Sequence, residues 1–123
     1  MIAQNLDIAK NLIEKWKKLE KKIVFTNGCF DLLHAGHMFL LDFAADQGDY
    51  LVVGLNSDDS IKRLKGKNRP IQNQNTRYEN LKNVKNVDSV IIFNDDTPEN
   101  LIKEIKPNIL VKGKDYKKKE VVG

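Results

Sequence analysis

Short apolar runs alternate with segments of helical character along this chain. The runs are rich in Val, Ile and Phe, and they are short enough to predict buried strands. Their nearly continuous apolar character is typical of parallel strands that are covered on both faces. The expected strands cover residues 22–26, 50–55, 87–93 and 108–111.

The segments between these runs carry helix signals. Asn56 to Asp58 can cap a short helix, and Thr97 followed by Pro98 is a favourable helix opening. Because strand and helix alternate, the sequence predicts an α/β fold with a doubly wound parallel sheet. Right-handed crossovers then place a ligand at the carboxyl ends of the strands. The longer helices are expected over residues 5–20, 35–47, 75–84 and 98–106.

The helix expected over residues 5–20 is amphipathic. Its lysines fall outside the apolar face, and we interpret them as a solvated surface. Because the helix precedes the first strand, we expect residues 1–21 to be an appendage to a domain at 22–123. The apolar positions at the spacing of one helix face are Leu6, Ala9, Ile13 and Trp16.

Length and composition narrow the classes of function. A chain of 123 residues predicts one domain, and its formal charge of +4 favours anionic ligands without choosing among them. We expect no nucleic-acid partner, because finger, RNP and basic-zipper motifs are missing. We expect no membrane partner, because no apolar run reaches about 18 residues. The single cysteine and the lack of a signal-peptide pattern predict a cytoplasmic location.

Two histidines follow the first strand and its Asn27-Gly28 turn. His34 and His37 lie at the start of the next helix, and Gly36 between them removes a side chain where something approaches closely. A helix N-terminus offers free N–H groups and partial positive charge, so two imidazoles added there make a site for phosphate oxygens. The dinucleotide fingerprint and the Walker A loop are absent. Nucleotidyl transfer remains, a reaction that needs aligned reactants and donors for the charge that develops.

The amino-acid sequence of this stretch resembles a known family signature. Asn-Gly-Cys-Phe-Asp-Leu-Leu-His-Ala-Gly-His at 27–37 resembles the signature of the H-x-G-H nucleotidyltransferases, the cytidylyltransferase-like superfamily. Within it, the wording is most similar to the adenylyltransferase domains of ADP-heptose synthases, and the likeness covers about residues 22–123. Further blocks match in order at residues 53–58, 62–66, 69–70, 95–98, 110–113 and 115–116.

The resemblance implies a Rossmann-like nucleotidyltransferase fold with an extra N-terminal helix. It also implies an enzyme that moves AMP from ATP to D-glycero-β-D-manno-heptose 1-phosphate, releases pyrophosphate and gives ADP-heptose for lipopolysaccharide core. Two alternatives stay open: a cytidylyltransferase acting on a polyol phosphate such as glycerol 3-phosphate, and a nucleotide-binding fragment without turnover. Magnesium is expected to arrive with ATP, with no dedicated protein metal cage. Assembly into a homo-oligomer is left open.

The resemblance also assigns residues to the site. His34, His37 and Lys65 would act on the phosphates, with Lys65 in a mobile basic loop that closes over them. Arg77 would bind the phosphate of the acceptor. The residues expected at the nucleotide are Asn27, Gly28, Phe30, Gly36, Lys112, Gly113 and Asp115.

Other uses of the same residues are weighed against these assignments. Cys29, His34 and His37 are zinc-ligand types, but the resemblance argues against a metal centre. Cys29 as a nucleophile has no covalent step to serve, and we interpret it as a small buried residue. Asp31 orients either the histidines or its own turn. Three cations near Lys65 share its role or are plain surface charge: Arg63, Lys67 and Arg69.

The end of the chain departs from the resemblance. Similar sequences read Lys-Gly-Gly-Asp-Tyr where this one has Lys114 in place of the second glycine, which puts a turn with φ > 0 in question. Similar enzymes continue with a strand and a Ser/Thr-rich helix opening, whereas no Ser or Thr follows Thr97 here. We therefore expect a domain that is short at its C-terminus, with weak triphosphate binding and low or undetectable turnover. An exposed sheet edge would favour self-association.

Overall fold

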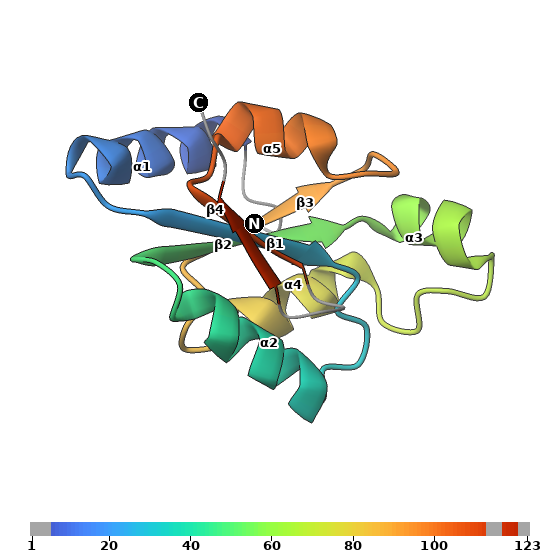
Figure 1. Ribbon diagram of the computed structural model, residues 1–123. Helices are drawn as coiled ribbons and strands as arrows, with labels where there is room; N and C mark the ends of the chain where they lie inside the picture. Colours follow the sequence, from blue (N-terminus) through green and yellow to red (C-terminus); the bar gives the residue numbers. More distant parts are fainter. Residues whose placement is uncertain (1–5, 113–116, 121–123) are drawn as a thin grey trace.

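The computed structural model describes residues 6–112 and 117–120, and they form one layered α/β unit (Figure 1). Helices and strands alternate as the apolar pattern predicts. In chain order the elements are α1 (Leu6–Lys18), β1 (Ile23–Gly28), α2 (Ala35–Ala45), β2 (Tyr50–Asn56), α3 (Asp58–Lys65), α4 (Gln74–Lys82), β3 (Ser89–Phe93), α5 (Glu99–Ile105), β4 (Ile109–Lys112) and β5 (Lys117–Glu120).

The strands form a single sheet in the order β3-β2-β1-β4-β5. The first four strands run parallel, with Val24 of β1 in register with Leu51 of β2 and Ile109 of β4. Helices α1 and α5 cover one face of the sheet, and α2 and α4 cover the other (Figure 1). The doubly wound parallel fold predicted from the sequence is therefore confirmed, and the carboxyl ends of β1 and β2 lie side by side.

The apolar core is divided between the two faces of the sheet. Successive side chains of a strand point to opposite faces. Val24 therefore joins the cluster under α2 and α4, whereas Ile23 and Phe25 join the cluster under α1 and α5. All three side chains are at most 1% exposed. This arrangement explains why the strands read as continuous apolar runs rather than alternating ones.

Helix α1 is packed as a full member of one layer. Ala9, Ile13 and Trp16 are buried against the sheet and α5, as their helical spacing predicts. The ring of Trp16 stacks on Tyr50 at the start of β2, with 4.0 Å between the ring centroids. Residues 6–18 thus close the core on this face, and the expected division into an appendage at 1–21 and a domain at 22–123 stays a prediction.

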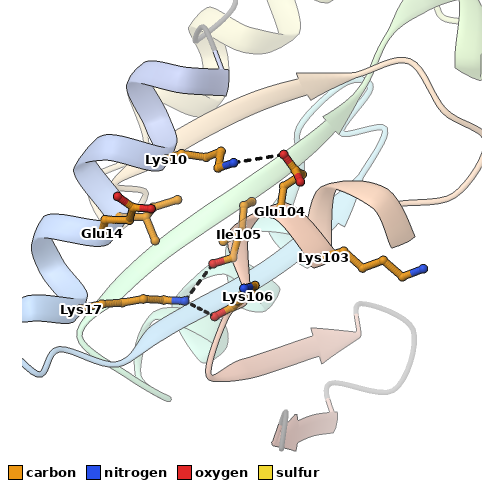
Figure 2. A pocket seen from close by; sticks show the side chains of 8 residues that line it. Lys10, Glu14, Lys17, Lys103, Glu104, Ile105 and Lys106 are labelled. Atoms are coloured by element: carbon orange, nitrogen blue, oxygen red, sulfur yellow. Dashed lines mark hydrogen bonds and ion pairs between the residues drawn. The ribbon is translucent and has the colours of Figure 1, made fainter. Parts of the chain in front are cut away.

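Polar contacts also hold α1 against α5 (Figure 2). Lys10 pairs with Glu104, with 3.1 Å between Nζ and Oε1. Lys17 Nζ donates to the backbone oxygen of Ile105 at 2.9 Å and to that of Lys106. These carbonyls end α5, so Lys17 serves as a C-terminal cap from another helix. A cavity of about 320 Å³ lies between the two helices, and its charged groups include the members of these contacts.

The sheet differs from the expectation at one edge. Residues 117–120 form β5, which pairs antiparallel with β4, so the edge of β4 that the sequence leaves exposed is covered. The segment Lys-Lys-Lys-Glu has no apolar pattern, and only pairing with β4 makes it a strand. Charged residues are typical of edge strands because they discourage further pairing.

Two helix openings also differ in detail from the sequence prediction. Helix α4 begins at Gln74, because Asn73 caps it by accepting the N–H of Thr76 at 2.8 Å. Helix α5 begins at Glu99, with Pro98 at the cap position. In the described part of the chain, no helix is long and apolar enough to cross a membrane.

Candidate functional site

The N-terminus of α2 is capped by the two histidines themselves. His34 is the N-cap in extended conformation, and its Nδ1 accepts the N–H of Gly36 at 3.0 Å. His37 reaches back, and its Nδ1 accepts the N–H of His34 at 3.2 Å. This reciprocal pair is a capping box built from imidazoles. The helix opening and the phosphate site expected from the sequence therefore involve the same side chains.

The cap fixes which nitrogen of each ring carries the proton. A nitrogen that accepts an N–H must be unprotonated, so the hydrogen of each neutral imidazole lies on Nε2. Neither Nε2 has a hydrogen-bond partner among the described residues. His34 and His37 therefore present two N–H donors for which residues 6–112 and 117–120 supply no acceptor.

The two rings form a compact pair. They stack with 4.0 Å between centroids, and Phe30 packs against the ring of His37 at 5.4 Å. A Cβ on Gly36 would lie 2.9 Å from Cε1 of His34, so the ring of His34 is what requires glycine there. Burial, followed by the charges of His34 and Lys65, lowers the pKa of His37. The neutral Nε2–H form is thus favoured at neutral pH.

Two cavities of similar size meet at the histidine pair. One has a volume of about 270 Å³ and the other about 280 Å³. They share a common wall made of Cys29, Phe30, His34 and His37. The first is completed by Asn27, Gly28, Gly36 and Leu40. The second is completed by Asp31, Ile61, Lys65 and Arg69.

The second cavity carries the cations. Lys65 ends α3, and Arg69 lies in the loop that follows. Arg63 points elsewhere, because its Nε pairs with Asp96 at 2.7 Å and its Nη2 donates to the backbone of Asn94. Of the basic segment, Lys65 and Arg69 are the cations placed beside the histidines. From the sequence, Arg63 and Arg69 were equally good candidates to share the role of Lys65. In the structure, Arg69 lines the cavity and Arg63 does not.

Asp31 connects the basic loop, residues 66–73, to the loop before α2. Its Oδ2 accepts the N–H of Ile71 at 2.7 Å, and its Oδ1 accepts the N–H of Gln72 at 2.9 Å. Burial raises the pKa of Asp31, but these two hydrogen bonds, followed by the charges of Arg77 and Arg69, outweigh it and lower the pKa overall. The sequence left open whether Asp31 orients the histidines or its own turn, and in the structure its oxygens accept from backbone about forty residues away.

Arg77 has a different place from the one expected. Its side chain has no exposed surface, and its Nη2 pairs with Asp58 Oδ1 at 2.7 Å. Its Nη1 donates to the backbone oxygens of Cys29 at 3.0 Å and Asn56 at 2.7 Å, and its Nε donates to that of Gln72 at 3.0 Å. A guanidinium so engaged has no free face for an acceptor phosphate. It instead joins the ends of β1 and β2 to the basic loop.

The remaining predicted residues are divided between the site and the undescribed part of the chain. Lys112 is exposed at the end of β4, the strand beside β1. Thr26 of β1 donates its hydroxyl to the backbone oxygen of Val111 at 2.8 Å, which fixes these two strand ends together. Gly113 and Asp115 lie outside the described residues, so their expected contacts with nucleotide stay predictions.

The site has little to offer a metal ion directly. Among residues 6–112, no group of three or more His, Cys, Asp or Glu side chains is arranged to hold one. Asp31 is the carboxylate that lines the cavities, and both of its oxygens already accept backbone N–H groups. The expected arrival of magnesium with ATP stays a prediction. Cys29 is half-buried rather than buried and lines both cavities.

Sequence reasoning missed Gln72 altogether. Its backbone meets both Asp31 and Arg77, and its Oε1 accepts the N–H of Leu32 at 3.2 Å. No local pattern marks such a residue, because every partner except the nearby α4 is far away in the chain. The Asn73 cap, by contrast, could have been found from its spacing to Thr76.

Known proteins show the same combination of sequence and fold. Residues 25–121 match the cytidylyltransferase-like family. The bifunctional protein HldE of Campylobacter concisus is 62% identical over 107 residues, which are 87% of this chain and 23% of that protein. HldE of Nitrobacter hamburgensis is 52% identical over 122 residues, which are 99% of this chain and 25% of that protein. The chain spans about a quarter of the length of these curated relatives.

A solved structure agrees with the sequence matches. The lipopolysaccharide core biosynthesis protein from Thermoplasma volcanium superposes with a TM-score of 0.67 and 34% identity, over 74% of this chain and 73% of that one. The match at 25–121 begins within β1 and includes the histidine pair and the basic loop. With its parallel sheet and the H-x-G-H helix opening in place, this chain belongs to the cytidylyltransferase-like family.

Proposed function

We propose that the protein is an adenylyltransferase that transfers AMP from ATP to D-glycero-β-D-manno-heptose 1-phosphate, releasing pyrophosphate and forming ADP-heptose. The observation that carries the proposal is the pair of Nε2–H donors of His34 and His37, held between two cavities. The similarity to proteins named HldE and to a lipopolysaccharide core biosynthesis protein supports the choice of acceptor. The cytoplasm, where ATP is made, is the compartment we assign to the reaction.

The two cavities suit the two substrates. We assign ATP to the cavity lined by Asn27, Gly28 and Leu40, because it lies between the end of β1 and the N-terminus of α2, where backbone N–H groups favour phosphate. We assign the sugar phosphate to the cavity of Lys65 and Arg69, where two cations face a dianion. The histidine pair lies between them, where the acceptor oxygen must meet the α-phosphorus.

The chemistry follows from this placement. An oxygen of the sugar phosphate attacks the α-phosphorus of ATP, a new P–O bond forms, and the bond to pyrophosphate breaks. Negative charge builds on the phosphate oxygens as this happens. The Nε2–H donors are fixed by the cap and need no reorganisation, so they stabilise that charge where it develops. Lys65 and Arg69 lower the repulsion between the two anionic substrates.

The test is release of pyrophosphate by the purified chain. Incubation with ATP, magnesium and D-glycero-β-D-manno-heptose 1-phosphate is expected to release it and to form ADP-heptose. The matched reaction with CTP and glycerol 3-phosphate is expected to release none. Release in the second reaction alone would assign the chain to the cytidylyltransferases. ATP binding by calorimetry without turnover on either acceptor would show a nucleotide-binding domain that is not a catalyst.

A further inference from the structure

The basic loop over residues 66–73 has almost no apolar anchor. Residues 62–69 are exposed throughout, and Ile71, its one large apolar side chain, is 60% exposed. Hydrophobic burial therefore does not hold the loop in place. Its position beside the histidines must come from polar contacts. Asp31, in the loop before α2, supplies two of them by accepting the N–H groups of Ile71 and Gln72.

The contact between the two loops is reciprocal. Asp31 accepts from the backbone of Ile71 and Gln72, and the side chain of Gln72 accepts the N–H of Leu32. Both carboxylate oxygens are used, so the loop is fixed in orientation as well as in distance. Charge-assisted bonds of this kind are the stronger class of hydrogen bond.

The backbone around Asp31 is strained in a way that serves this contact. Phe30 has φ 47° and Leu32 has φ 57°, so two residues with side chains adopt the left-handed region on either side of Asp31. Such conformations persist where surrounding contacts over-determine them, and they gather at functional sites. Here the surrounding contacts are the Asp31 bonds and the Arg77 bond to Cys29.

We propose that Asp31 is a positioning residue: through Ile71 and Gln72 it holds the basic loop so that Lys65 and Arg69 face His34 and His37. This inference rests on the proposed function in assigning phosphate to the cavity. Each oxygen of Asp31 accepts one backbone N–H, and an ionised carboxylate has no proton to donate to a phosphate. Its effect on a phosphate ligand must therefore pass through Arg69, which lies in the loop, and Lys65, which ends α3 directly before the loop.

Asp31→Asn tests the proposal with little change of volume. The amide keeps one acceptor oxygen and sets an NH₂ donor against the second backbone N–H. We expect affinity for inorganic tripolyphosphate, measured by calorimetry, to fall on the order of tenfold. Asp49→Asn is the matched control, because Asp49 accepts the N–H of Lys22 at 2.7 Å at the opposite end of the strands. The control is expected to leave the affinity unchanged.

A double-mutant cycle separates positioning from general stability. In the Lys65→Ala, Arg69→Ala background, Asp31→Asn is expected to change tripolyphosphate affinity by less than about twofold, since its route of action is gone. An equal loss in both backgrounds would overturn the proposal, and so would the absence of tripolyphosphate binding by the unchanged chain. Gln72→Ala, which keeps Asp31, should show the same dependence with a smaller loss if Asp31→Asn does not fold.

The two proposals can fail separately. A chain that binds tripolyphosphate with this dependence but releases no pyrophosphate would overturn the transfer reaction and leave the role of Asp31 intact. A rate of pyrophosphate release that Asp31→Asn leaves unchanged would keep the reaction and overturn the positioning role.

Discussion

The end of α5 and the start of α2 are capped in different ways. At the end of α5, Lys17 donates to the carbonyls of Ile105 and Lys106, and its ammonium points into the seam with α1 (Figure 2). At the start of α2, His34 and His37 accept two backbone N–H groups with Nδ1. Both ends satisfy backbone groups that a helix leaves without partners.

The two caps differ in whether the capping side chain keeps a free hydrogen-bonding group. Lys17 is turned inward between two helices, and its pKa is lowered by burial and then by the charge of Lys106. Each imidazole is bifunctional, so one nitrogen caps the helix while the other stays available. A cap made of histidine thus joins a structural task to a chemical one, whereas the lysine cap serves structure alone.

Trp16→Ala is expected to have the largest effect, because it disrupts the packing of α1 on the sheet. The side chain is 9% exposed and stacked on Tyr50, so its removal leaves a cavity between α1 and the sheet. We expect the free energy of unfolding to fall by about 3–5 kcal/mol, measured by urea denaturation. Leu19→Ala, at a side chain 60% exposed, is the control and should cost less than about 0.5 kcal/mol. Similar losses in the two variants would show that α1 is an appendage after all.

The α2 side is separated into its two tasks by His34→Asn. Asparagine is a favourable N-cap, so the thermal midpoint should stay near that of the unchanged chain. The outward Nε2–H is gone, and the rate of pyrophosphate release should fall roughly 10²–10³-fold. His34→Ala should lose the same rate and, in addition, about 1 kcal/mol of stability with the cap. An Asn variant with unchanged turnover would remove His34 from the chemistry.

The lysine cap should show the converse behaviour. Lys17→Met keeps the apolar stem and removes the donor to the last carbonyls of α5. A cation at a helix C-terminus contributes up to about 1 kcal/mol, and we expect a loss of that size in urea denaturation. Lys18→Met on the exposed face is the control. Tripolyphosphate affinity should be the same in both, and a selective loss with Lys17→Met would contradict a purely structural cap.

The smallest expected effect is on the pH dependence of stability. Burial, and then the charges of His34 and Lys65, lower the pKa of His37 in the folded state. Below the ordinary histidine pKa of about 6.5, the unfolded chain therefore binds this proton first, and stability falls as the pH falls. Thermal midpoints between pH 7.5 and pH 5.5 should drop more steeply for the unchanged chain than for His37→Asn. Equal slopes would show that His37 does not carry the effect.

Local signals were sufficient for most of the fold. The apolar runs expected to be strands coincide with β1, β2, β3 and β4, and Ser57 caps α3 as its position predicts. The histidine pair could also be placed, because helix spacing and the preceding strand define the edge on which it lies. These features depend on residues that are close together in the chain.

Contacts between distant residues decided the rest. Residues 117–120 have no strand pattern of their own, and β4 supplies the partner that makes them β5. Arg77 looks like a free cation from its sequence, and only folding surrounds it with three backbone oxygens and Asp58. Asp31 gains its partners across forty residues.

The sequence by itself therefore determined the order of the elements, the parallel sheet and the chemistry of the helix opening at α2. Periodicity and capping are local, and they act on neighbouring residues whatever the rest of the chain does. The tertiary structure decided which cations face the histidines and which are engaged in hydrogen bonds and ion pairs within the protein. That choice depends on where two loops meet in space. The residue type alone does not reveal it, because an arginine or lysine can have either role.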